Sequence, residues 1–207
     1  LFSICKRHGV LIISDEIHQD LVAGPLPFTS ALTVSNGAYA NNIIAMSSLS
    51  KSFNMASLHH AEVIIPNEEL RIQYNAFKGL VYHTDSDVIA ETAITAAYTH
   101  PEAEKWLADL LAVVKENYDY LCHNLLIALP KLRISPMDGT YLVWIDFGAY
   151  VKAEDIRNIF ENQCGIAPSF GEWFGGERYA TFVRLNLATS LENIKIATNS
   201  MIQHIHP

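Results

Sequence analysis

Cysteine is scarce in this chain, and the three that occur, Cys5, Cys122 and Cys164, are far apart and form no CxxC pattern. An odd number of widely spaced cysteines argues against a disulfide framework and against a zinc site. The nine histidines show no spacing that indicates metal ligands. We therefore expect neither disulfides nor a bound metal, as is typical of a protein from a reducing compartment.

The chain also lacks an excess of basic residues and has no long apolar run. Its 22 acidic residues outnumber the 14 basic ones, the formal net charge is -8, and no basic stripe occurs. We therefore expect no nucleic-acid partner. The apolar stretches fall far short of the roughly 20 residues that span a bilayer, and the first residues show no signal-peptide pattern. These absences predict no membrane partner and a cytoplasmic location.

Hydrophobic residues are plentiful and make up 50% of the chain, which is enough for a substantial core. Apolar runs at residues 10–13, 42–46 and 61–65 predict strands, and the first is expected to be buried on both faces. Apolar residues at helical spacing after residue 101 predict a long connecting helix. The strand and helix signals beyond it predict a small α+β unit. The expected division is residues 1–100 and residues 101–207.

Three charged side chains stand at the ends of apolar runs or within them. Asp15 follows the first run, Lys51 lies among hydroxyl residues after the second, and Arg184 lies inside a later run. Ligands in open α/β sheets bind outside the carboxyl ends of strands, so Asp15 and Lys51 are expected to share one crevice. The alternative is that Asp15 only caps a turn, that Lys51 is a solvated loop residue and that Arg184 pairs with a structural acid.

Four motifs occur in one order along the chain: SDEIHxDL at residues 14–21, SxSKxFNxxxL at 48–58, GTYLxW at 139–144 and FVRLN at 182–186. In this order they resemble the class I/II aminotransferases, the pyridoxal-phosphate enzymes of the aspartate aminotransferase fold type. Within that family the chain looks closest to the cystathionine β-lyase-like C–S lyases. The resemblance implies an α/β fold: the C-terminal part of the large cofactor-binding domain followed by a small α+β C-terminal domain.

The resemblance also implies roles for five residues around pyridoxal 5′-phosphate. Lys51 would attach the cofactor covalently and, once displaced by substrate, remove the Cα proton. Asp15 would pair with the pyridine nitrogen and His18 would approach the ring hydroxyl, while Ser48 would contact the phosphate. Arg184 would bind the carboxylate of an amino-acid substrate as a two-pronged fork. No residue is implied as a metal ligand.

The chain departs from the common family pattern at three positions. His18 stands where many transaminases have a tyrosine, and His59 stands where they have an arginine, which leaves one phosphate contact in doubt. Ser57 replaces a usual glycine. If that glycine takes a positive φ, a serine is expected to be strained there.

The predicted activity is β-elimination from a sulfur-bearing amino acid such as cystathionine, which releases a thiol, pyruvate and ammonia. Transamination is the alternative, because both reactions begin by removing the Cα proton. Family members are nearly twice this length, and the part without a counterpart here would supply the phosphate cradle and a stacking aromatic. A third reading is a noncatalytic remnant that serves association. The resemblance also implies a homodimer.

Overall fold

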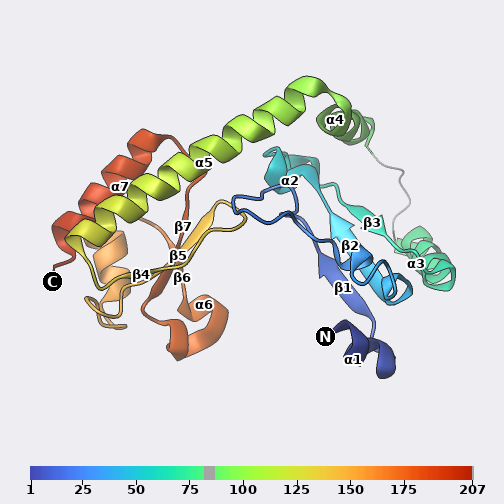
Figure 1. The fold of residues 1–207 in the computed structure, drawn as a ribbon, viewed down its shortest axis with the longest axis horizontal. Helices are drawn as coiled ribbons and strands as arrows, with labels where there is room; N and C mark the ends of the chain where they lie inside the picture. The colour runs from blue at the N-terminus through green and yellow to red at the C-terminus, as the bar shows by residue number, and fades with distance from the viewer. Residues whose placement is uncertain (82–86, 207) are drawn as a thin grey trace. The chain divides into compact units, whose positions relative to one another are not determined.

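The computed structural model describes residues 1–81 and 87–206, and the chain forms two compact units. Unit 1 comprises Leu1–Val22 and Leu26–Leu107. Unit 2 comprises Ala23–Pro25 and Ala108–Pro207. Each unit has its own sheet (Figure 1).

Unit 1 contains a three-stranded sheet in the order β1-β2-β3. Strand β1 (Ile12–Asp15) is parallel to β2 (Ile43–Ser47), and β3 (Glu62–Ile64) is antiparallel to β2. Asp15 stands opposite Met46 in the register of the parallel pair. The carboxyl ends of β1 and β2 therefore lie at the same edge of the sheet, and the loops that follow them begin side by side.

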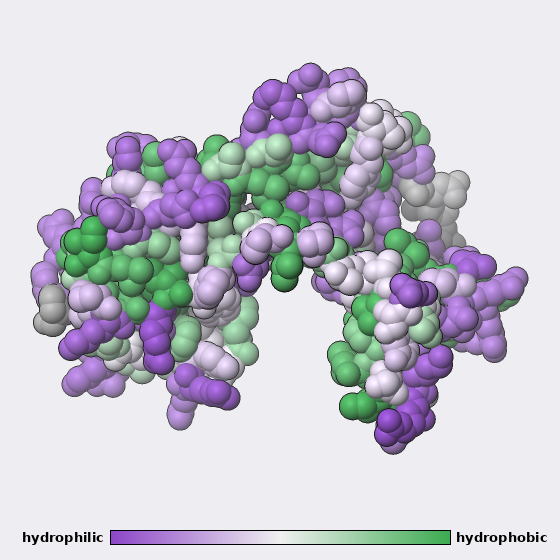
Figure 2. Space-filling model, in the orientation of Figure 1, coloured by the Kyte–Doolittle hydropathy of each residue, from purple (hydrophilic) through white to green (hydrophobic). Residues whose placement is uncertain are grey.

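The two parallel strands differ in burial. In β2, Ile43 is 0% exposed and Ala45 is 2% exposed, as expected for a central strand. Near β1, Leu11 is 39% exposed and Ile13 is 64% exposed, so the expectation that residues 10–13 are buried on both faces is wrong for this structure. Side chains alternate across a strand, so these two residues share one face. Apolar side chains are accordingly visible at the surface over β1 and α1 (Figure 2).

The helices of unit 1 begin and end at recognisable signals. The first helix, α1 (Phe2–Arg7), is followed by Gly9 at φ 65°, a left-handed position that glycine adopts without strain. Helix α4 (Val88–Thr99) is capped by Asp87, whose carboxylate accepts from the amides of Ile89 and Ala90. By its sequence alone, Ser86 can also cap a helix that runs to about Tyr98, but Ser86 lies outside the described residues. The remaining helical segments of unit 1 are η1 (Ala31–Thr33), η2 (Ala40–Asn42), α2 (Leu49–Ser52), η3 (Ala56–Leu58) and α3 (Glu68–Val81).

Unit 2 is built on an antiparallel sheet in the order β4-β5-β7-β6. Its strands are β4 (Arg133–Ile134), β5 (Leu142–Asp146), β6 (Ser169–Phe170) and β7 (Phe182–Asn186). The long helix α5 (Pro101–Ala128) and the last helix α7 (Leu191–His204) lie along one side of this sheet (Figure 1). Buried side chains of both helices and of β5 and β7 form one hydrophobic core. Shorter helical segments are η4 (Asn158–Gln163), α6 (Glu172–Gly175) and η5 (Gly176–Tyr179).

One buried polar residue ties α5 to the chain that leaves β7. The Asn117 side chain is fully buried, and its Nδ2 donates to the carbonyl oxygens of Leu187 at 2.9 Å and Thr189 at 2.8 Å. Replacing it with leucine would leave two carbonyls without this donor, because the apolar side chain cannot donate. We expect Asn117→Leu to lower the free energy of unfolding by about 2–4 kcal/mol.

Urea unfolding followed by circular dichroism measures this change. Asn162→Ala is the matched control, since Asn162 is exposed and its Nδ2 donates to Asn158 Oδ1, at 2.9 Å, on the surface. We expect the control to change stability by less than about 0.5 kcal/mol. Equal effects of the two substitutions would contradict the role assigned to Asn117.

Candidate active site

Two of the predicted residues follow the parallel strands of unit 1. Asp15 is the last residue of β1, and Lys51 lies in α2, five positions beyond Met46, the partner of Asp15 in β2. Both therefore belong to the carboxyl edge of the sheet, where ligands bind in α/β folds. Asp15 is exposed, and its Oδ1 accepts from the amide of Ile17 at 3.2 Å. Asp15 thus caps the following turn, as the alternative reading proposed, and still presents its carboxylate to solvent.

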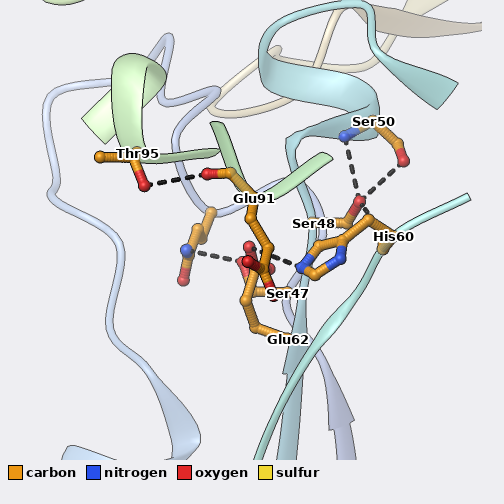
Figure 3. A network of polar contacts seen from close by, with 8 residues as sticks. Ser47, Ser48, Ser50, His60, Glu62, Glu91 and Thr95 are labelled. Carbon is orange, nitrogen blue, oxygen red and sulfur yellow. Dashed lines mark hydrogen bonds and ion pairs between the residues drawn. The ribbon is translucent and has the colours of Figure 1, made fainter. Parts of the chain in front are cut away.

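Ser48 caps the short helix that carries Lys51. Its Oγ accepts from the amide of Ser50 at 3.1 Å, lies 2.7 Å from Ser50 Oγ and donates to the carbonyl of His60 at 2.6 Å (Figure 3). Ser48 is only 5% exposed. Its hydroxyl is therefore engaged in holding the turn, and its role as a phosphate contact stays a prediction.

A second set of polar contacts joins the two loops at this edge. Ser52, directly after Lys51, donates its hydroxyl to Asp20 Oδ2 at 2.8 Å, and Gln19 Nε2 donates to Ser47 Oγ at 2.9 Å. Sequence reasoning missed these contacts because each joins residues about 30 positions apart. The only signal was that Asp20 and Ser52 fall inside the two motifs that also contain Asp15 and Lys51.

The segment after α2 corrects the expectation about Ser57. Ser57 lies inside η3, and the left-handed residues of this segment are Asn54, at φ 54°, and His59, at φ 48° and ψ 39°. The strain expected at Ser57 is therefore absent, and the left-handed backbone falls on an asparagine and a histidine instead. The next residue, His60, lies 3.6 Å from the Glu62 carboxylate through its Nε2 (Figure 3).

His18 lies in the turn after β1, three residues beyond Asp15, and is half-buried. Asp15, His18, Ser48 and Lys51 thus all belong to unit 1, on the two loops that leave the carboxyl ends of the parallel strands. These four residues therefore lie on two neighbouring loops, and their roles toward a cofactor stay predictions.

Arg184 belongs to unit 2, at the middle of β7, opposite Trp144 of β5 and Ser169 of β6. Its Nη2 donates to Ser169 Oγ at 3.2 Å, and its guanidinium carbon lies 4.5 Å from the centre of the Phe174 ring. Its Nε is buried and has no hydrogen-bond partner among the residues that the structure describes. No carboxylate within the described parts of the chain forms an ion pair with Arg184, so pairing with a structural acid is not what this arginine does there.

The surroundings of Arg184 suit an anion. With Ser169, Asn186 and Asn193 it lines a cavity of about 370 Å³. Its guanidinium lies over the Phe174 ring, and the planar fork of a guanidinium matches the two oxygens of a carboxylate. Binding of a substrate carboxylate by Arg184 stays a prediction.

The described residues hold neither a candidate metal centre nor a helix that could span a membrane. Across residues 1–81 and 87–206, no group of three or more histidine, cysteine, aspartate or glutamate side chains is arranged to hold a metal ion. In the same ranges, no helix combines the length and the apolar character needed to cross a membrane.

The fold and these motifs define a class. The chain belongs to the aminotransferase class I and II family, whose family model matches residues 1–201. Among curated proteins it is 33% identical to the protein MalY of Escherichia coli K12 over 98% of this chain and 50% of that protein. It is 30% identical to the cystathionine β-lyase PatB of Bacillus subtilis 168 over 94% of this chain and 50% of that protein.

The solved structures agree with this membership. The crystal structure of a C–S lyase with bound pyridoxal phosphate, from Staphylococcus hominis, matches with a TM-score of 0.86 and 28% identity. The match covers 98% of this chain and 51% of that one. The family resemblance and the expected α/β fold are confirmed, and the chain spans about half the length of the relatives it matches.

Proposed function

We propose that the whole protein is a pyridoxal-phosphate-dependent enzyme acting on amino acids, with C–S β-lyase activity. The observation that carries this is the pair of Asp15 and Lys51 at the carboxyl edge of β1 and β2, in a chain similar to a cystathionine β-lyase and a C–S lyase. The reaction would break the Cβ–S bond of a substrate such as cystathionine and release a thiol, pyruvate and ammonia. The sulfur-bearing substrate is part of the proposal.

The chemistry of the available side chains fits the cofactor. Asp15 presents an exposed carboxylate suited to a protonated ring nitrogen, and Lys51 supplies a primary amine suited to an aldehyde. When bound, pyridoxal phosphate supplies an electron sink for the negative charge that develops at Cα. Ser48 and His18 are proposed as further contacts, with the phosphate and with the ring hydroxyl.

Each residue would then have one task. The Asp15 carboxylate would keep a proton on the ring nitrogen, because an opposite charge at about 4 Å is worth on the order of 4 kcal/mol at an effective dielectric near 20. The Lys51 amine would take the proton from Cα. Arg184 would bind the substrate carboxylate, with Phe174 and Ser169 holding its guanidinium in place.

The deciding experiment incubates the whole protein and pyridoxal phosphate with cystathionine and follows pyruvate. Pyruvate that appears with a free thiol in equal amounts supports the lyase. Glutamate formed from 2-oxoglutarate without pyruvate would instead establish a transaminase, since the two reactions share the Cα proton removal. Formation of neither product would overturn the proposal.

The proposal extends to the organisation of the protein. Residues 1–100 would be the C-terminal part of the cofactor-binding large domain, and residues 101–207 the connector helix and small C-terminal domain. We propose a cytoplasmic protein, because the cysteine usage suits a reducing compartment and the apolar runs noted above are too short to span a bilayer.

A noncatalytic association role is the second candidate, and α3 favours it. No residue of this helix is buried, and Ile72, Phe77 and Leu80 are 62%, 68% and 77% exposed. Isolated helices of about this length are marginal in water, so α3 is expected to gain stability from a partner. We propose a second copy of the chain as that partner, which would make the protein a homodimer.

A further inference from the structure

We propose that Asp20 is a positioning residue for Lys51, acting through the buried hydroxyl of Ser52. The inference rests on the proposed function, in which Lys51 is the reactive amine. It adds a residue that holds the lysine-bearing turn without itself touching cofactor or substrate.

The link is a buried hydrogen bond to a charged acceptor. Ser52 is 0% exposed, and its Oγ donates to Asp20 Oδ2 at 2.8 Å. Hydrogen bonds to a carboxylate are about twice as strong as neutral ones. Asp20 lies in the loop after β1 and Ser52 in the turn after β2, so this bond joins the loop that carries Asp15 to the turn that carries Lys51.

The turn depends on such outside support. Helix α2 has only four residues, Leu49–Ser52, and a single helical turn does not hold its own shape in water. Ser48 fixes its amino end through the His60 carbonyl. At the carboxyl end, Ser52 is the residue with a polar anchor, and it is the immediate neighbour of Lys51.

Aromatic packing supports the same end of the turn from another side. The ring of Phe53 stacks on Trp106 with centroids 5.6 Å apart and an interplanar angle of 22°. It also meets Tyr98 edge-on at 6.4 Å. These contacts hold the backbone after Lys51 against α4 and the first turns of α5, which restricts the direction in which the turn can move.

Tyr98 connects the aromatic contacts to the polar ones. Burial raises the pKa of Tyr98, and the negative charges of Asp20 and Glu62 raise it further, while hydrogen bonds with Ser47 and Gln19 oppose the shift. Asp20 therefore stands among groups that come from both loops and from α4. A substitution at Asp20 is therefore expected to loosen the turn that bears Lys51.

The test uses the whole protein and five variants of it. Asp20→Ala and Ser52→Ala each remove the bond, and the double variant removes both partners. Asp20→Asn keeps an oxygen that accepts from Ser52. Ser190→Ala is the matched control, because it removes one hydroxyl cap, to the amide of Asn193, in unit 2.

Two measurements are made on each variant. Amide hydrogen exchange is followed at residues 49–54. In parallel, the protein is treated with pyridoxal phosphate and borohydride, and mass spectrometry compares the labelling rate of Lys51 with that of Lys152, a lysine whose side chain is 77% exposed.

We expect both alanine variants to raise exchange at residues 49–54 by about tenfold or more. The same variants should lower Lys51 labelling relative to Lys152 at least about threefold, because an amine on a loosened turn is less often presented in the reactive orientation. The double variant should do no more than either single one, since both remove the same bond. Asp20→Asn should recover part of the loss seen in Asp20→Ala, because its neutral oxygen still accepts from Ser52 but more weakly than a carboxylate. Ser190→Ala should leave both measurements unchanged.

Several results would overturn the inference. Unchanged exchange in Ser52→Ala would show that the bond does not hold the turn, and this variant decides the matter even if Asp20→Ala fails to fold. Faster amide exchange with unchanged Lys51 labelling would show that the bond stabilises the turn but does not position Lys51. If Lys51 of the wild-type protein is labelled no faster than Lys152, the proposed role of Lys51 itself fails. If wild-type Lys51 is labelled faster than Lys152 and the variants keep that preference, only the role of Asp20 fails.

Discussion

Replacing Lys51 with alanine is expected to abolish covalent attachment of pyridoxal phosphate and to lower β-elimination by the whole protein by at least about 10³-fold. A positioned base contributes about 10²–10⁴-fold to proton transfer, and this change also removes the nucleophile that joins the cofactor to the protein. The turn itself should persist, because Ser48 and Ser52 hold it through side chains other than that of Lys51. Borohydride trapping followed by peptide mass spectrometry measures attachment, and pyruvate release measures turnover.

Lys152→Ala is the matched control for this prediction. Lys152 is an exposed lysine of unit 2 whose amine lies 3.9 Å from Glu154, so its loss removes the same positive charge without changing a residue of unit 1. The control should retain wild-type attachment and turnover. Attachment of the cofactor to Lys51→Ala at the wild-type level would show that another amine is the reactive one.

Replacing Arg184 with alanine is expected to raise KM for the amino acid by about 10- to 100-fold while kcat changes little. The carboxylate is bound equally in the ground and transition states, so losing its partner weakens binding without raising the chemical barrier. Arg184→Lys should recover only part of the loss, because an ammonium cannot reproduce the two parallel hydrogen bonds of a guanidinium. Steady-state kinetics of pyruvate release separates KM from kcat.

Arg157→Ala is the control for Arg184. Arg157 also belongs to unit 2 and also lies over an aromatic ring, 4.3 Å from the centre of Phe170, but it pairs with Glu161 and Glu172. Because the Arg157 guanidinium already pairs with two carboxylates, it is not expected to bind a substrate carboxylate. We expect Arg157→Ala to leave KM for the amino acid unchanged. A KM that stays constant in Arg184→Ala would remove this residue from the proposed site.

Much of the local structure could be predicted because it depends on neighbouring residues. Gly9 follows α1 and Ser190 caps α7, and a glycine after a helix and a serine before one are signals that can be read in the sequence. The order of the four motifs was enough to identify the family, which the match over residues 1–201 confirms. These features follow from short-range backbone chemistry and from residue order, both of which are present in the linear chain.

Burial at β1 could not be predicted in the same way. The apolar run at residues 10–13 indicated a strand covered on both faces, and Ile13 is instead 64% exposed. Apolar residues indicate that a face tends to be covered, but whether another layer reaches that face depends on the whole fold. The left-handed backbone fell on Asn54 and His59 rather than on Ser57 for a related reason, since η3 sets the backbone at Ser57.

The linear order of residues was sufficient to indicate the fold family, the acid, the amine and the guanidinium, because those chemical groups and their spacing are properties of the chain itself. It did not reveal that Ser52 donates to Asp20, that the Ser48 hydroxyl is bonded within the turn or that Arg184 lies against Phe174. Each of these contacts joins segments far apart in the chain or depends on which neighbour is closest in space. Only folding brings such groups within hydrogen-bond or ring-contact distance, and folding therefore determines how the reactive side chains are held.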